Sequence, residues 1–163
     1  MGLSGWPGEY LAGDLYIGGD RGAAGHPSGR ARDPRRDEVS ETPPDRAPAL
    51  RVTTMPADAN AYGDIFGGWL MSQMDMAAGL VAARFSKGRA VTVAMDGMQF
   101  HAPVAVGDEV SVFCDIVKVG RTSMTIAVEA WRRDRHQEEQ CRVTQARFVF
   151  VAIDEHKRPR VIG

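Results

Sequence analysis

The sequence is poor in cysteine and histidine and has no long apolar run. Cys114 and Cys141 are its two cysteines, and the four histidines are scattered, so no group has the spacing of a zinc site. No segment approaches the roughly 18 apolar residues that cross a membrane, and the N-terminus lacks the basic and apolar segments of a secretion signal. These absences predict a cytoplasmic protein without a metal, whose cysteines are reduced, buried side chains.

Charge of either sign is not in excess. The formal net charge is -1 and the isoelectric point is about 6.4, so no overall field would draw the chain to nucleic acid or to an anionic membrane. The 163 residues are 44% hydrophobic and 25% charged, which is typical of one globular domain. We therefore expect neither nucleic acid nor membrane among its partners.

Residues 1–48 differ in composition from the rest of the chain. They hold six of the nine prolines and half of the 18 glycines, and such a segment buries too little apolar surface to offset its ordering entropy. We predict a disordered leader over 1–48; a later translation start, near Val39, is the alternative. The segment GGDRGAAG (18–25) follows no strand and lacks G-x-G-x-x-G spacing, so we assign it no phosphate-binding function.

Residues 49–163 show the periodicities of regular structure. Apolar residues recur every three or four positions between Phe66 and Phe85, which predicts a helix with one buried face. The expected elements are a strand at 50–55, a helix at 66–85 and strands at 90–100, 109–119, 122–133 and 141–154. The order β-α-β-β-β-β with mostly short hairpin links predicts an α+β fold, in which an antiparallel sheet of about five strands wraps around one long helix.

For two of these strands, the alternation of apolar and polar residues predicts which side chains are buried. By alternation, the core positions are Val110, Val112, Cys114 and Ile116 on one strand, and Met124, Ile126, Val128 and Ala130 on the next. Small residues at 77–79 and 82–83 keep the helix slim, which predicts close packing against the sheet.

The start of the predicted helix carries an unusual motif, NAYGDIFGGWLMSQMD (60–75). Asp64 has two interpretations there: an N-cap, which stabilises a helix by about 1 kcal/mol, or a group that does chemistry. Gly67 and Gly68 favour the second, because a glycine inside a helix costs about 1 kcal/mol relative to alanine and is expected where something approaches the backbone. Free N–H groups at a helix start, helped by the helix dipole, would hold a developing oxyanion.

Four sequence blocks together resemble one enzyme family. They are NAYGDIFGGWLMSQMD (60–75), VTVAMDGMQFHAPVAVGDEV (91–110), VKVGRTSM (117–124) and TQARFVFVAID (144–154). In this order they resemble the YciA-type acyl-CoA thioesterases, which have the hotdog fold, and the resemblance covers about 50–160. It implies hydrolysis of acyl-CoA to free fatty acid and CoA without a cofactor, since CoA is part of the substrate. It also implies a homodimer with active sites at its interface, commonly assembled into a trimer of dimers.

The resemblance implies roles for the residues of the helix motif. Asp64 would be the catalytic carboxylate, as the general base or, in a variant, as the nucleophile. We hypothesise that the Gly67 and Gly68 amides form the oxyanion hole, and that Asn60 orders the loop or the attacking water. Asp75 is the rival, because a helix carboxylate seven residues after the glycine pair is catalytic in the related phenylacetyl-CoA thioesterase-like branch; it could also simply face solvent or a dimer seam.

The phosphates of CoA require cations and backbone amides near a groove. The hairpin block around GRTS supplies them, and the resemblance favours CoA binding there over an ordinary polar turn. The predicted CoA-binding residues are Lys118, Gly120, Arg121, Thr122 and Ser123, with Arg147 as a weaker candidate.

Other residues and other functions stay open at this point. Phe66, Trp69, Met71 and Met98 either line an acyl channel or pack in the core, and His101 is either catalytic or part of a chain turn. The alternative function is a non-catalytic acyl-CoA sensor on the same fold; known sensors of that design carry an upstream helix-turn-helix, which a Gly- and Pro-rich leader would not form. Acyl-thioester hydration is disfavoured because the Asn-Pro-x-His-x-Asp signature is absent.

Overall fold

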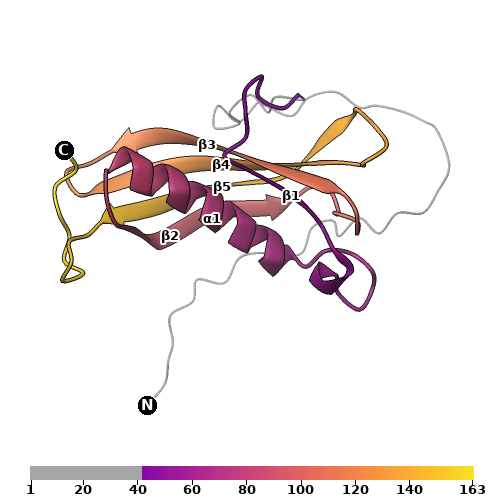
Figure 1. Ribbon diagram of the computed structural model, residues 1–163, viewed down its shortest axis with the longest axis horizontal. Coiled ribbons are helices and arrows are strands. Elements are labelled where there is room, and N and C mark those ends of the chain that lie inside the picture. Colours follow the sequence, from indigo (N-terminus) through magenta and orange to yellow (C-terminus); the bar gives the residue numbers. More distant parts are fainter. Residues whose placement is uncertain (1–41) are drawn as a thin grey trace, which may run out of the picture. The chain divides into compact units, whose positions relative to one another are not determined.

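The computed structural model describes residues 42–163, which contain one long helix and five strands. In chain order these are β1 (Leu50–Thr53), the single-turn 3-10 helix η1 (Pro56–Asp58), α1 (Gly67–Phe85), β2 (Ala90–Phe100), β3 (Glu109–Val119), β4 (Ser123–Arg133) and β5 (Gln140–Ala152), as Figure 1 shows. Each predicted strand and the predicted helix is present, and every boundary agrees within two residues. The periodicity of the sequence therefore located all the major elements.

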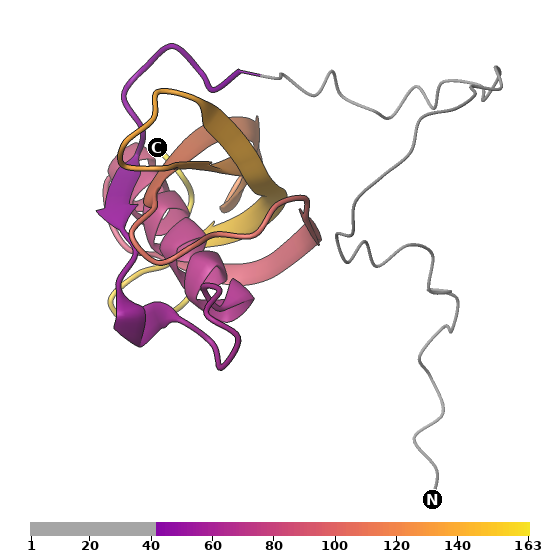
Figure 2. The ribbon, with the colours of Figure 1, turned by 90° about the vertical axis from the view of Figure 1, so that its right-hand side faces the viewer.

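The five strands form one antiparallel sheet in the spatial order β1-β3-β4-β5-β2. The sheet curls around α1, which crosses its concave face (Figure 2). Within residues 42–163, the end strands β1 and β2 each pair on one side only. The predicted α+β arrangement, an antiparallel sheet wrapped around a helix, is confirmed.

The core lies between α1 and the sheet. Most of the predicted core positions of β3 and β4 are buried: Val110 and Val112 have no exposed surface, and neither do Ile126 and Val128. The prediction was incomplete for β3, because Ser111 and Phe113 are buried as well and Ile116 is only partly buried. On α1, the alanines Ala77, Ala78 and Ala82 are completely buried, so the helix approaches the sheet closely. The two ends of the predicted helix stripe differ from expectation, because Phe66 and Phe85 are 54% and 42% exposed.

The edge strand β2 carries apolar side chains that this chain leaves exposed. Val91, Val93, Met95 and Phe100 are each more than a third exposed. The pairing of β2 with β5 is also interrupted by two register shifts, and Gly97, which lies within the second, has φ of 76°. An apolar edge strand of this kind calls for a covering partner.

Part of the predicted leader, residues 42–48, is described by the structure, and it contacts β3. Arg46 forms a 2.5 Å ion pair with Asp115 and donates a hydrogen bond to the Cys114 carbonyl, 3.3 Å away. Next to it, the Ala49 N–H donates to the Val112 carbonyl at 2.8 Å. The rest of the predicted leader, including the segment 18–25, lies outside the described residues.

The two cysteines have different surroundings. Cys114 is buried, and burial raises the pKa of its thiol to about 12, so it is protonated at neutral pH. Cys141 is free and exposed, so the prediction of burial was wrong for this residue, which lies at the hairpin end of β5 where the core has ended. Within residues 42–163, no helix is long and apolar enough to cross a membrane.

Candidate active site

Asp64 lies in a loop that its own backbone hydrogen bonds close. The Asn60 side-chain carbonyl accepts from the N–H groups of Tyr62 and Asp64 at 2.8 and 3.2 Å. In return, the Asn60 N–H donates to the Asp64 carbonyl at 2.7 Å. Gly63, with φ of 90°, makes the bend between them possible. The main chain of Asp64 is therefore fixed on both sides by Asn60.

The loop is also joined to the chain that precedes β3. Asp64 opposes Ala105 in an isolated antiparallel bridge, and the Ile65 N–H donates to the Val104 carbonyl at 2.9 Å. The Asp64 side chain is exposed, and no group within residues 42–163 hydrogen-bonds or ion-pairs with its carboxylate. A fixed backbone thus presents an unengaged carboxylate.

Helix α1 begins without a side-chain cap. Its N-cap is Phe66, and no side chain hydrogen-bonds to the first turn. The N-cap interpretation of Asp64 was therefore wrong, because residues 64 and 65 pair with the 104–105 segment before the helix starts. The first bond that reaches back from the helix runs from the Leu70 N–H to the Phe66 carbonyl at 3.1 Å. The amides of residues 67–69 precede this bond, so the helix leaves them available for a ligand.

The two helix glycines serve different purposes in the described structure. A Cβ added at Gly67 would lie 3.0 Å from the ring of Phe100, so close packing explains this glycine. A Cβ added at Gly68 would meet nothing within 4 Å. No described neighbour requires a glycine at 68, and its missing side chain leaves open space beside the free amides.

Asp75, the rival carboxylate, has a partner. It lies half-buried on α1, and the Thr92 hydroxyl of β2 donates a 2.6 Å hydrogen bond to it. This contact ties the helix to the edge strand.

The predicted CoA-binding residues form the turn between β3 and β4. The Gly120 N–H donates to the Ser123 carbonyl at 2.7 Å, and the Thr122 and Arg121 carbonyls accept from Ala152 and Ile162 at 2.8 and 3.0 Å. Lys118 and Arg121 are exposed. The turn is thus fixed by its backbone while its cationic side chains face solvent.

This turn lies far from Asp64 in one chain. The bridge partner of Asp64, Ala105, precedes the first residue of β3, whereas the turn follows its last. The 11 residues of β3 separate the two sites by roughly 30 Å at about 3.3 Å per residue. The structure therefore does not bring the predicted catalytic and CoA-binding residues together within a single subunit.

The end of the molecule that holds the turn is basic. The Arg160 guanidinium donates to the Ser86 carbonyl at 2.6 Å, and the Ile153 N–H donates to the Arg89 carbonyl at 2.9 Å, so the end of α1 and the C-terminal segment meet there. Their cations are Arg84, Lys87, Arg89, Lys157, Arg158 and Arg160, beside Lys118 and Arg121 of the turn. The nearby acids in the C-terminal segment are Asp154 and Glu155, so positive charge dominates this end.

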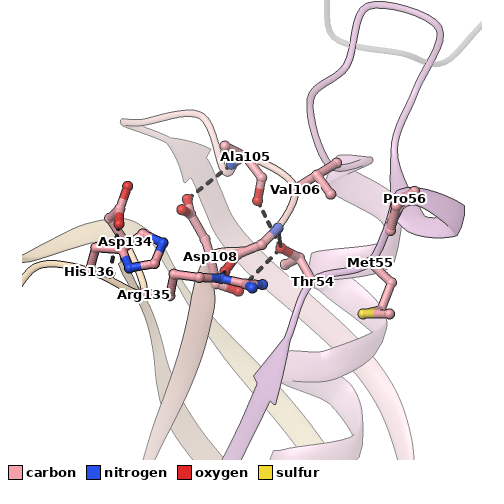
Figure 3. A pocket seen from close by; sticks show the side chains of 10 residues that line it. Thr54, Met55, Pro56, Ala105, Val106, Asp108, Asp134, Arg135 and His136 are labelled. Atoms are coloured by element: carbon pink, nitrogen blue, oxygen red, sulfur yellow. Dashed lines mark hydrogen bonds between the residues drawn. The ribbon is translucent and has the colours of Figure 1, made fainter.

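A cavity of about 480 Å³ lies beside Ala105, the bridge partner of Asp64, and Figure 3 shows the side chains that line it. It is lined by 54–56, 105–108 and 134–136. Thr54 and Asp108, which line it, are not among the functional residues predicted from the sequence. Among residues 42–163, no group of three or more His, Cys, Asp or Glu side chains could hold a metal ion.

Comparison with known proteins places the chain in a family. Residues 62–139 match the thioesterase superfamily, to which the chain belongs. An uncharacterized acyl-CoA thioester hydrolase of Zymomonas mobilis is 55% identical over 125 residues, 77% of this chain and 84% of that protein. The acyl-CoA thioester hydrolase YciA of Escherichia coli K12 is 46% identical over 116 residues, 69% of this chain and 88% of that protein.

Solved structures give the same result. The hexameric thioesterase of Yersinia pestis has a TM-score of 0.70 at 46% identity and matches 74% of this chain and 98% of its own. A hexameric hotdog fold thioesterase of Campylobacter jejuni has a TM-score of 0.69 at 34% identity, covering 72% of this chain and 91% of its own. The predicted resemblance to YciA-type thioesterases and the predicted hotdog fold are confirmed.

Proposed function

We propose that this protein hydrolyses acyl-CoA thioesters to the free acid and CoA. The observation that carries the proposal is its 46% identity to the YciA acyl-CoA thioester hydrolase over 88% of that protein's length. The geometry at the start of α1 supports the same chemistry, since thioester hydrolysis needs a base for water and donors for the carbonyl oxygen.

In the proposed reaction, Asp64 is the general base. Its exposed, unengaged carboxylate takes a proton from water as the water oxygen bonds to the thioester carbon. Charge develops on the carbonyl oxygen, and the amides of Gly67 and Gly68 donate to it, supported by the positive end of the helix dipole. The C–S bond then breaks, the carboxylic acid is released and CoA leaves as the thiolate, which takes up the proton held by Asp64 and so restores the base. Asn60 keeps Asp64 in place through the hydrogen bonds described above.

Direct attack by Asp64 on the carbonyl is the variant mechanism. It would form a mixed anhydride that water then opens. When labelled water attacks the aspartyl carbonyl carbon of this anhydride, 18O enters the Asp64 carboxylate. General-base catalysis puts the label into the fatty acid alone. Mass spectrometry of the digested enzyme separates these two routes.

The assignment of Asp64 over Asp75 rests on their contacts. Asp75 is already engaged by the Thr92 hydroxyl at 2.6 Å, and it lies half-buried on the helix side. Asp64 precedes the first helical residue, Gly67, by three positions, and its carboxylate is exposed. A catalytic base must hold the attacking water close to the thioester carbon. The exposed carboxylate of Asp64 is free to do so.

We infer that the CoA moiety binds to a second subunit. The phosphates of CoA fit the basic end around Lys118–Ser123, which lies roughly 30 Å from Asp64 in one chain. An antiparallel dimer joined through the apolar edge of β2 would bring the Asp64 end of one subunit toward the basic end of the other. Both solved relatives described above are hexameric, and we propose a trimer of such dimers for this protein.

The proposed activity is tested with a panel of acyl-CoA substrates from acetyl to palmitoyl, followed by release of free thiol. We expect turnover that requires no added metal or cofactor. Binding of acyl-CoA without any hydrolysis would contradict the proposal and favour the sensor alternative. Sedimentation of the same preparation measures the oligomeric state.

A further inference from the structure

The position of Asp64 depends on the segment it pairs with. Asp64 and Ala105 oppose each other in the antiparallel bridge, next to the 2.9 Å hydrogen bond from Ile65 to Val104. Opposed residues in such a pair lie within about 4.5–5.5 Å of each other. A shift of Ala105 would therefore move Asp64 with it.

Both main-chain polar groups of Ala105 are held by the same two residues. Its N–H donates to the Asp108 carboxylate at 3.0 Å, and its carbonyl accepts from the Thr54 hydroxyl at 2.7 Å (Figure 3). The Asp108 N–H also donates to this carbonyl at 3.2 Å and closes a tight turn. Gly107 has φ of 94° in the third position of the turn, where a type II turn requires a positive value.

Thr54 and Asp108 are themselves fixed and shielded from water. The Thr54 hydroxyl accepts from the Gly107 N–H at 2.9 Å, and the Asp108 carboxylate lies 3.4 Å from the Arg132 guanidinium. Thr54 is 1% exposed and Asp108 is 4% exposed. Solvent therefore has little access to replace either side chain as the partner of Ala105.

We propose that Thr54 and Asp108 are positioning residues for thioester hydrolysis, which act on Asp64 through the main chain of Ala105. The proposal rests on the proposed role of Asp64. Neither residue touches the substrate; each fixes the turn against which the Asp64 loop pairs. Because a misplacement of about 1 Å at a catalytic group can cost about 100-fold in rate, loosening this turn lowers kcat.

The first test removes the Thr54 hydroxyl and then restores it. Thr54→Val lowers kcat by about 10- to 100-fold with little change in KM, because the substrate contacts are intact. Thr54→Ser, which keeps the hydroxyl, recovers most of the activity. Ser111→Ala is the control: it removes another buried hydroxyl, bonded to Arg51 at 3.1 Å and not to the turn, and leaves kcat unchanged.

The second test measures coupling to Asp64. In the Asp64→Ala background the base is absent, so adding Thr54→Val causes no further loss of the residual rate. A purely structural defect would instead multiply the two losses, and that result would overturn the proposal. Melting temperatures of all variants are measured alongside, and rates are taken well below them.

Asp108 supplies an independent pair of variants if Thr54→Val does not fold. Asp108→Asn keeps a side-chain oxygen that accepts from the Ala105 N–H, whereas Asp108→Ala removes it. We expect kcat to fall about 10- to 100-fold in the alanine variant and to stay within about threefold in the asparagine variant. Equal activities of the two would overturn the proposal.

Failure of this proposal is distinguishable from failure of the proposed mechanism. A fully active Asp64→Ala enzyme would reject the base assignment. An inactive Asp64→Ala enzyme beside a folded, fully active Thr54→Val enzyme would keep that assignment and reject the positioning role.

Discussion

The Thr92 hydroxyl on β2 donates a 2.6 Å hydrogen bond to the carboxylate of Asp75 on α1. This contact joins the central helix to an edge strand that, in the part of the chain that the structure describes, pairs with β5 alone. Asp64, eleven residues earlier in the sequence, has no such partner within residues 42–163. The two aspartates of the helix motif thus differ in their hydrogen bonding, which supports the proposal that Asp64 rather than Asp75 is the catalytic base.

Asp75→Ala is expected to affect stability more than catalysis. Loss of the bond from Thr92 lowers the free energy of unfolding by about 1 kcal/mol, and kcat stays within a few-fold of the wild type. Thr92→Val is the matched variant and gives a similar change in melting temperature. A 100-fold loss of kcat in Asp75→Ala, with the melting temperature unchanged, would make Asp75 the catalytic residue instead.

Gly68→Ala is expected to stabilise the helix and impair turnover. Alanine improves helix propensity by up to about 1 kcal/mol, and no described atom would clash with the new methyl group. That methyl group would occupy the space beside the free amides, so kcat/KM falls. The measurements are a melting curve and steady-state kinetics on the same preparation. A more stable enzyme with unchanged kcat/KM would show that the substrate does not approach Gly68.

Thr144→Val is expected to increase stability. Thr144 is completely buried, and its hydroxyl has no hydrogen-bond partner within the part of the chain that the structure describes. Replacing an unsatisfied buried hydroxyl with a methyl group of similar size raises the free energy of unfolding by about 1 kcal/mol. Thr54→Val provides the contrast, since the hydroxyl at 54 is bonded and its removal destabilises. Chemical denaturation of the two variants would show changes in the free energy of unfolding of opposite sign. A loss of stability in Thr144→Val would contradict this prediction.

Arg121→Ala is expected to weaken binding of the nucleotide part of the substrate. Loss of one charge-assisted contact to a phosphate raises KM for acyl-CoA by about tenfold at low salt, and by less at high salt. An acyl-pantetheine substrate, which lacks the nucleotide, is hydrolysed equally well by the variant and the wild type. An equal loss with both substrates would place Arg121 outside the CoA site.

The sequence predicted the elements well because their signals are local. Alternation along 109–119 and 122–133 indicated which side chains face the helix, and Val112 and Ile126 are completely buried as expected. The exposure of residues at the ends of the elements was predicted less well. Cys141 and Phe85 continue an apolar pattern beyond the region in which the helix and the sheet cover each other. The local sequence pattern indicates the periodicity of an element. The burial of its end residues depends instead on how far the helix or sheet that packs against it extends.

The sequence predicted only part of the candidate site. The motif indicated Asp64 and the two helix glycines as candidate site residues. It did not distinguish Gly67, which packs against Phe100, from Gly68, which faces open space. Thr54 gave no catalytic signal, because its hydrogen bond to Ala105 joins segments 51 residues apart in the chain. Asp108 is only three residues from Ala105, but the pairing of that turn with the Asp64 loop is a property of the folded chain. The distance between Asp64 and the GRTS turn is likewise a property of the folded sheet.

The most direct test of the central claim compares Asp64→Asn with the wild type in single-turnover hydrolysis of acyl-CoA. The substitution preserves size and removes the basic carboxylate, so we expect a folded oligomer that binds acyl-CoA and hydrolyses it at least about 100-fold more slowly. A rate within threefold of the wild type, with the fold intact, would contradict the assignment of Asp64 as the catalytic base.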